Sequence, residues 1–194
     1  RYTIRDGYYR VLSADGSSVI SDTRYPDRHG WEFSWRGGGV FHATRALQLR
    51  AAAYTGLRLP TLNELYRPFV VFPVTTQANA GLKPERLFGY EAGADWQATS
   101  GLKFSATAFN NRLKDAITNV TIATNTRERE NIAAIRAKGI ELTAQAQVGK
   151  FGFDGSLAYT DAREHAPGTD LDGFHPSATP AWDETATISY RPRE

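Results

Sequence analysis

The stretch Y-T-G-L-R-L-P-T-L-N-E-L-Y-R-P-F, residues 54–69, begins in one segment in which apolar and polar residues alternate and leads toward a second. Pro60 has no N–H to donate to a neighbouring strand, so the strand that leads into it must end there. Thr61 and Glu64 have the spacing of a capping box, which predicts one short helical turn over residues 62–66. The stretch therefore predicts a long connection with local order between two strands.

The alternation on both sides of this connection predicts strands. Residues 47–59 place Leu and Ala on one face and Gln, Arg and Tyr on the other, and residues 87–98 repeat the pattern. A helix would scatter these residues around its surface, whereas a strand sorts them by face. Similar segments predict strands at 31–43, 102–114, 132–148, 151–163 and 181–191, with a weaker one at 2–12 interrupted by Gly7. We expect an all-β fold, an antiparallel meander of about eight strands.

The connections alternate in length, which favours a particular sheet layout. Tight turns are predicted at 44–46, 99–101 and 149–150, and long loops at 13–30, 59–86, 115–131 and 164–180. In a meander this places the turns at one end of the sheet and the loops at the other. Outer-membrane barrels have this asymmetry, with short periplasmic turns and long extracellular loops. The apolar run at 69–72 is expected in a loop, and 117–123 either extends a strand or forms a small hairpin.

Hydropathy limits how this chain could cross a membrane. Mean hydropathy is -0.46, and no apolar run approaches the length of a membrane-spanning helix. A membrane interpretation must therefore be a β-barrel, in which alternation dilutes the apolar signal. Aromatic residues near the predicted strand ends fit the two girdles of such a barrel. The loop-end set is Trp31, Phe88, Tyr159 and Trp182, and the turn-end set is Phe41, Trp96, Phe104, Phe151 and Tyr190.

Composition excludes several classes of protein. The chain has 194 residues, enough for one domain, and it has no Cys, so neither a disulfide nor a Cys-ligated metal is possible. A net charge of +2, from 23 basic and 21 acidic residues, gives no reason to expect nucleic-acid binding. No sequence motif of a hydrolase, nucleotide-binding loop or zinc enzyme is present. We expect no enzymatic activity, no cofactor and no metal, although His165 and His175 share one loop.

Four short motifs resemble one family. They are P-T-L-N-E-L-Y at 60–66, L-K-P-E at 82–85, E-A-G at 91–93 and N-I-A-A-I-R-A-K-G-I-E-L at 131–142. In this order, and in predicted strands, they resemble the barrel of TonB-dependent outer-membrane receptors over roughly residues 31–191. The resemblance implies a bacterial outer-membrane receptor that imports a scarce nutrient, such as an iron–siderophore complex or cobalamin, bound at its extracellular loops. The implied partners are outer-membrane lipid, that nutrient and the TonB complex.

The resemblance also implies parts that this sequence does not show. Receptors of the family carry an N-terminal plug domain, a TonB-contacting segment before it, and a barrel of about 22 strands. No plug-like region or TonB-contacting segment is recognisable here. We therefore expect residues 1–194 to form part of the β-barrel domain of a receptor, whose contact with TonB runs through a plug region outside this chain.

Arginine and aromatic residues in the predicted loops are the candidate ligand-binding residues. Arginine pairs anionic groups in a fork geometry and stacks on planar ligands, and aromatic side chains hold apolar or ring-bearing ones. The same residues could instead pack the loops against each other. The candidates are Arg58, Tyr66, Arg67, Phe69, Arg127 and Arg129.

Two other functions remain open from the sequence. A self-contained eight-stranded outer-membrane barrel could serve a structural or adhesive role, because eight strands can close around their own side chains. The second alternative is a soluble, lipocalin-like binding protein. In such a protein the apolar side chains would face the interior of the barrel, among them Leu47, Leu49, Leu142 and Trp96.

Overall fold

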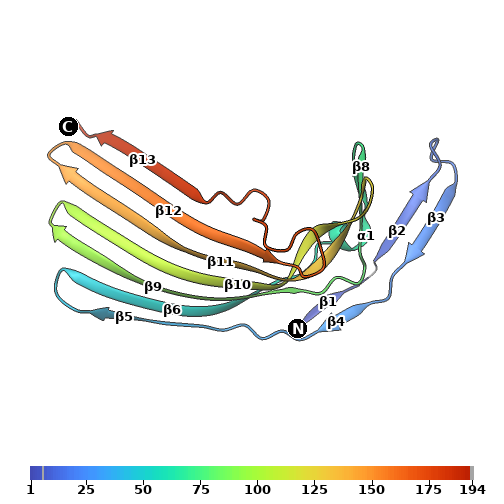
Figure 1. The fold of residues 1–194 in the computed structure, drawn as a ribbon, viewed down its shortest axis with the longest axis horizontal. Coiled ribbons are helices and arrows are strands. Elements are labelled where there is room, and N and C mark those ends of the chain that lie inside the picture. The colour runs from blue at the N-terminus through green and yellow to red at the C-terminus, as the bar shows by residue number, and fades with distance from the viewer. Residues whose placement is uncertain (6, 193–194) are drawn as a thin grey trace.

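Seven antiparallel strands form a curved meander that makes up most of the molecule in the computed structural model, which describes residues 1–5 and 7–192 (Figure 1). Along the sheet their order is β13-β12-β11-β10-β9-β6-β5. Their bounds are β5 Arg36–His42, β6 Leu47–Arg58, β9 Glu85–Thr99, β10 Leu102–Ala123, β11 Thr126–Val148, β12 Phe151–His165 and β13 Trp182–Tyr190. The predicted all-β antiparallel fold is confirmed.

The sheet is open. β5 and β13 lie at its two edges, and no ladder joins them in the described part of the chain (Figure 1). The small closed barrel expected as an alternative is therefore not formed. The meander also has fewer strands than the expected eight, because the 2–12 segment pairs elsewhere. Its first strand starts at Arg36, and residues 31–35 lie outside any strand.

The two ends of the sheet differ as predicted. The tight turns after β5, β9 and β11 lie together at one end, and the long connections after β6 and β12 lie at the other, where the extended β10–β11 hairpin also ends (Figure 1). At the first turn the Thr44 hydroxyl oxygen accepts the N–H groups of Ala46 (3.1 Å) and Leu47 (2.9 Å). This side-chain bonding reverses the chain within a few residues. We call the two ends the turn end and the loop end.

The predicted loop at 13–30 is wrong, because two strands occupy it. β2 (Tyr8–Leu12) pairs with β3 (Val19–Arg24), and β1 (Tyr2–Ile4) pairs with β4 (Arg28–Gly30). Between β2 and β3 the Asp15 carboxylate accepts hydrogen bonds from both Ser13 and Ser17, and these bonds lower the pKa of Asp15 to about 2. Ser, Asp and Gly thus mark the turn of a hairpin here. The hairpin stands away from the main sheet (Figure 1).

The predicted loop at 115–131 is also wrong. β10 and β11 continue through it to a tight hairpin around Asn125, so the extension of the 117–123 segment is the correct alternative. The alternation of apolar and polar residues fails there because both faces of the hairpin are covered at the loop end: side chains of the 166–171 segment pack on one face, and Ile117 packs on the other against the cluster that contains Leu65 and Leu82. The buried cluster with the 166–171 segment consists of Ala116, Val120, Ile132 and Ala166.

The long connection after β6 contains more structure than predicted. The capping box forms as expected: the Glu64 N–H donates to the Thr61 hydroxyl (3.2 Å), the Thr61 N–H donates to Glu64 (2.7 Å), and α1 spans Leu62–Tyr66. Beyond it β7 (Phe69–Val71) pairs with β8 (Val74–Gln77), so the expectation that 69–72 is a loop is wrong. β8 also pairs in parallel with β11.

The largest buried side chains lie at the loop end and not on the sheet. Ile4, Leu65, Tyr66 and Leu82 form one cluster that joins β1, α1 and the segment before β9. By contrast, large apolar side chains on the main sheet are exposed, Trp96 at 50 %. Among the described residues no helix is long and apolar enough to span a membrane.

Candidate ligand site at the loop end

The two faces of the main sheet differ in chemistry. On one face, which we call the apolar face, cross-strand partners continue from strand to strand as a row of Leu49, Ala94, Ala106, Leu142 and Leu157. On the other, the polar face, the Arg50 guanidinium lies 3.1 Å from Asp95, whose carboxylate also accepts from the Ser105 hydroxyl (2.5 Å). Among the described residues no second layer covers either face between the turn end and the loop-end aromatic residues. A sheet with one apolar and one ionic face is suited to separate lipid from water.

Aromatic side chains bound the apolar face at both ends. Trp96 stacks on Phe104 toward the turn end (5.9 Å between ring centroids), and Tyr159 contacts Trp182 toward the loop end (4.7 Å). Along β9, Trp96 and Phe88 are about 26 Å apart at about 3.3 Å per residue. With the strand tilt of about 40° found in outer-membrane barrels this corresponds to about 20 Å along the membrane normal, somewhat less than their apolar band of about 25 Å. These residues thus lie at the two ends of the apolar face, as predicted, whereas Trp31 of the predicted loop-end set lies outside any strand.

Three of the four sequence motifs meet in one polar cluster at the loop end. The Arg58 guanidinium pairs with Glu64 (3.0 Å) and with the buried Glu85. The Asn131 amide exchanges hydrogen bonds with the backbone of Lys83 (2.8 and 3.1 Å). Burial opposes ionisation of Glu64, but hydrogen bonds from Arg58 and Thr61 outweigh it, so the pKa of Glu64 lies below its ordinary value. The motifs therefore fix how α1 and the connection sit on the sheet.

The structure brings three predicted site residues together beside α1. The Arg129 guanidinium donates to the carbonyl oxygens of Asn63 and Arg67 (3.1 Å to Arg67) and lies over the Phe69 ring, 5.0 Å from its centroid. Arg58 reaches the same helix through Glu64. The guanidinium groups of Arg58 and Arg129 are therefore engaged in hydrogen bonds that hold the loops in place.

The other predicted residues lie in different environments. Tyr66 is buried and stacks on Tyr25, with ring centroids 4.5 Å apart. Arg67 and Arg127 are exposed, and neither guanidinium has a hydrogen-bond or ion-pair partner within residues 1–5 and 7–192. Of the six candidates, these two arginines retain the most freedom to meet a ligand.

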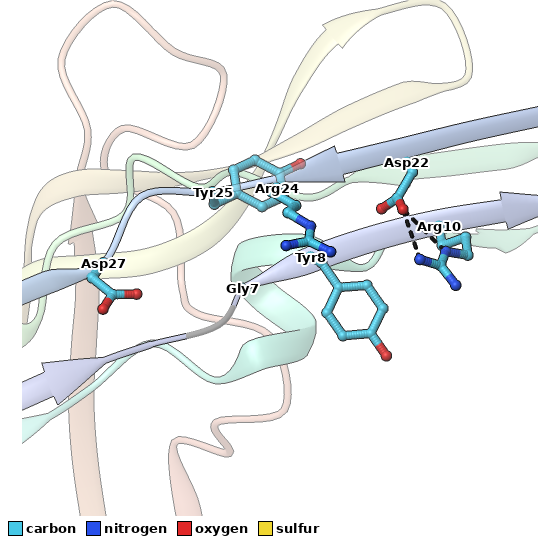
Figure 2. A pocket seen from close by; sticks show the side chains of 7 residues that line it. All are labelled: Gly7, Tyr8, Arg10, Asp22, Arg24, Tyr25 and Asp27. Carbon is cyan, nitrogen blue, oxygen red and sulfur yellow. Dashed lines mark hydrogen bonds and ion pairs between the residues drawn. The ribbon is translucent and has the colours of Figure 1, made fainter.

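A pocket that the sequence did not reveal lies at the base of the β2–β3 hairpin. Figure 2 shows its lining, from which the Arg24 side chain extends between Tyr25 and Tyr8, while Arg10 is paired with Asp22 (2.7 Å). The hollow measures about 340 Å³. Arg24 has no hydrogen-bond or ion-pair partner in the part of the chain that the structure describes. The lining residues are Gly7, Tyr8, Arg10, Asp22, Arg24, Tyr25 and Asp27.

A second hollow, of about 420 Å³, adjoins this one and reaches α1. It shares Gly7, Tyr8 and Arg10 with the first and adds Arg5 and the predicted site residue Arg67. We call the two hollows together the hairpin site. Among its described lining residues the arginines outnumber the carboxylates and the rings are tyrosines, a combination that suits an anionic, ring-bearing ligand. Sequence reasoning missed the hairpin site because it assigned 13–30 to a loop and so did not align Arg24 with Tyr8.

Comparison with known families gives a match over nearly the whole chain. Residues 1–193 match the family described as TonB dependent receptor-like, beta-barrel. The vitamin B12 transporter BtuB of Photobacterium profundum is 28% identical over 142 residues, which are 71% of this chain and 22% of that protein. The chain thus spans about a fifth of the length of this curated relative.

Solved structures of similar fold are also receptors. The siderophore receptor PirA from Acinetobacter baumannii superposes with a TM-score of 0.66 at 16% identity, covering 83% of this chain and 27% of that one. The Serratia marcescens hemophore receptor HasR, solved in complex with its hemophore HasA and heme, gives a TM-score of 0.70 at 16% identity, covering 94% and 33%. At these identities the likeness shows the fold.

Proposed function

The chain belongs to the TonB-dependent receptor β-barrel family, and from that membership we propose that it forms part of the barrel wall and ligand-binding mouth of an outer-membrane nutrient transporter. The apolar face contacts outer-membrane lipid, the polar face lines the interior, and the loop end opens to the outside. In the whole receptor, transport draws on the TonB complex through a plug domain.

One observation carries this proposal: the sheet has one apolar and one ionic face, and its folded connections all lie at one end. The row through Ala94 and Leu142 has no covering layer among the described residues, whereas Arg50 and Asp95 pair on the opposite face. A soluble sandwich would cover the apolar row with a second sheet. A lipocalin-like binder would enclose it in a closed barrel, and the open edges at β5 and β13 argue against that.

The hairpin site is the part of the chain that we propose binds the nutrient. It lies at the loop end, where it meets solutes arriving from outside, and Arg24 and Arg67 have free guanidinium groups there. Arg127 presents a third free arginine at that end. An anionic nutrient, such as a ferric siderophore, fits this chemistry better than a neutral sugar, because guanidinium groups select carboxylate, phosphate and similar anions.

A binding panel tests the proposal. The protein, expressed with the sequence that flanks this chain in its open reading frame, is titrated in detergent with ferric catecholate and hydroxamate siderophores, cyanocobalamin, haem and Cu²⁺. Quenching of Trp fluorescence reports binding. We expect an anionic member of the panel to bind and Arg24→Gln to weaken it, whereas Arg45→Gln, at the turn end, leaves binding unchanged. A folded protein that binds no member, or equal binding by Arg24→Gln, contradicts the proposal.

A further inference from the structure

A row of basic residues crosses the apolar face just beyond the loop-end aromatic residues. Cross-strand pairing places Arg86 opposite Lys114, Arg112 opposite Arg136, and Arg136 opposite Arg163. Lys138 adjoins them on β11, and all six side chains are exposed. We call this set the basic row: Arg86, Arg112, Lys114, Arg136, Lys138 and Arg163.

Half of the basic row is already neutralised. Arg86 pairs with Glu32 (2.6 Å) and Asp115 (2.8 Å), while Arg163 (3.0 Å) and Lys138 (3.9 Å) share Asp161. These three cations therefore have carboxylate partners from the chain itself.

The other half has no counter-ion of its own. Arg112, Lys114 and Arg136 make no ion pair or side-chain hydrogen bond within the described ranges. Like charges directly opposite each other destabilise a pair of strands, and Arg112 faces Arg136, which in turn faces Arg163. An anion that bridges the strands would turn this repulsion into attraction.

A hollow of about 360 Å³ lies at this place, with Arg112 and Lys114 in its lining. Its other walls include Phe33, Leu57 and Phe88, together with the Glu32 carboxylate, whose charge is already paired with Arg86. Phe88 also belongs to the aromatic residues that end the apolar band. The hollow thus offers guanidinium and ammonium donors on one side and apolar surface, continuous with the band, on the other. A ligand that fills it needs a phosphate-like anion joined to hydrocarbon.

We infer that the basic row binds the phosphate group of a membrane lipid in the leaflet at the loop end, with the lipid chains lying along the apolar face below it. The inference rests on the proposed function, because it requires the apolar face to contact lipid. Arginine binds phosphate through two parallel N–H donors, and basic clusters next to a membrane-spanning segment recognise anionic head groups. A free soluble anion would leave the apolar wall of the hollow without a partner.

The test compares lipids that differ only in phosphate. The protein with its flanking sequence is purified in non-ionic detergent and titrated with bisphosphorylated lipid A, enzymatically dephosphorylated lipid A and inorganic pyrophosphate, and bound lipid is counted by native mass spectrometry. The double variant Arg112→Gln/Arg136→Gln is compared with Arg36→Gln/Arg45→Gln, which removes the same charge from the polar face and the turn end.

We expect the phosphorylated lipid to bind the native protein and to lose about fivefold in affinity for each of the two cations removed, about 25-fold in all. The control variant and the native protein should bind alike, and pyrophosphate should not compete. Equal binding of dephosphorylated lipid, equal binding by the double variant, or tight binding of pyrophosphate alone would overturn the inference. Two further measurements are run on the same samples. Heat-modifiable gel mobility shows whether the barrel is folded, and the nutrient titration shows whether the proposed function holds.

Discussion

Asn131 and Lys83, far apart in sequence, are joined as if they were partners in a sheet. The Lys83 N–H donates to the Asn131 side-chain oxygen (2.8 Å), and the Asn131 amide donates to the Lys83 carbonyl (3.1 Å) and to that of Asp115 (2.6 Å). The side chain thereby satisfies backbone groups that a loop would otherwise leave unpaired. It ties the long connection to β11 and sets where the loop end begins.

Asn131→Asp should destabilise the loop end. The carboxylate cannot donate, so it loses the bonds to Lys83 and Asp115 and places a negative charge against both carbonyls; we expect about 3 kcal/mol. The temperature at which the purified protein loses its compact gel mobility should fall. Asn119→Asp, at an exposed position on β10, makes the same chemical change and should have little effect. Equal stability of both variants would contradict the assigned role.

Arg58→Gln should cost about 3 kcal/mol, because it leaves Glu85 buried without a counter-charge. Arg58→Gln/Glu85→Gln should recover much of that loss, since no buried charge remains. Denaturation by urea measures each variant in a double-mutant cycle. Additive effects of the two substitutions would show that the pair does not interact.

The Arg58–Glu64 contact should make the free energy of unfolding depend on pH in the acidic range. The pKa of Glu64 is lower in the folded state than in the unfolded state, so its contribution is present above the unfolded pKa of about 4.3. It is lost as pH falls through the lower, folded pKa. Urea unfolding followed from pH 7 down to pH 3 should therefore show a steeper loss for the native protein than for Glu64→Gln. Parallel profiles would rule out this contribution.

Glu164→Gln should stabilise the protein at neutral pH. Glu164 is buried, one of its carboxylate oxygens has no hydrogen-bond partner among the described residues, and burial raises its pKa. Ionisation is thus penalised in the folded state, and stability falls as pH rises through the unfolded and then the folded pKa. We expect a gain of about 1 kcal/mol at pH 7 and none at pH 4. The control Asp170→Asn, at an exposed position, should leave the free energy of unfolding unchanged at both pH values. A gain for Glu164→Gln at both pH 7 and pH 4 would contradict this explanation.

Much of the sheet could be predicted from alternation alone. β6, β9 and β12 lie where apolar and polar residues alternate, because one face of each strand stays largely apolar between the turn end and the loop-end aromatic residues. α1 could be predicted because Thr61 and Glu64 carry the capping signal in their spacing.

The loop end could not be predicted in the same way. Beyond Asp115, Ala116 and Val120 pack on one face of the hairpin against Ala166, and Ile117 packs on the other against the cluster of Leu65 and Leu82, so the apolar residues give no period of two. β8 adds to β11 in parallel through a contact distant in sequence, which leaves no local pattern. Of the residues that line the hairpin site, the sequence analysis named Arg67 but not Arg24, whose position depends on a hairpin with weak alternation.

We propose above all that the apolar face of the main sheet contacts lipid and the polar face contacts water. Because the chain has no Cys, single cysteine substitutions test this directly. Single substitutions Ala51→Cys and Ala52→Cys place a thiol on the apolar and the polar face of β6, and Ala144→Cys and Thr143→Cys do so on β11. In reconstituted vesicles, a charged, water-soluble maleimide should label Ala52→Cys and Thr143→Cys much faster than Ala51→Cys and Ala144→Cys. Fluorophores at the latter two positions should be quenched by lipid-borne spin labels. Labelling that is equally fast on both faces, or quenching at Ala52→Cys and Thr143→Cys instead, would contradict the account.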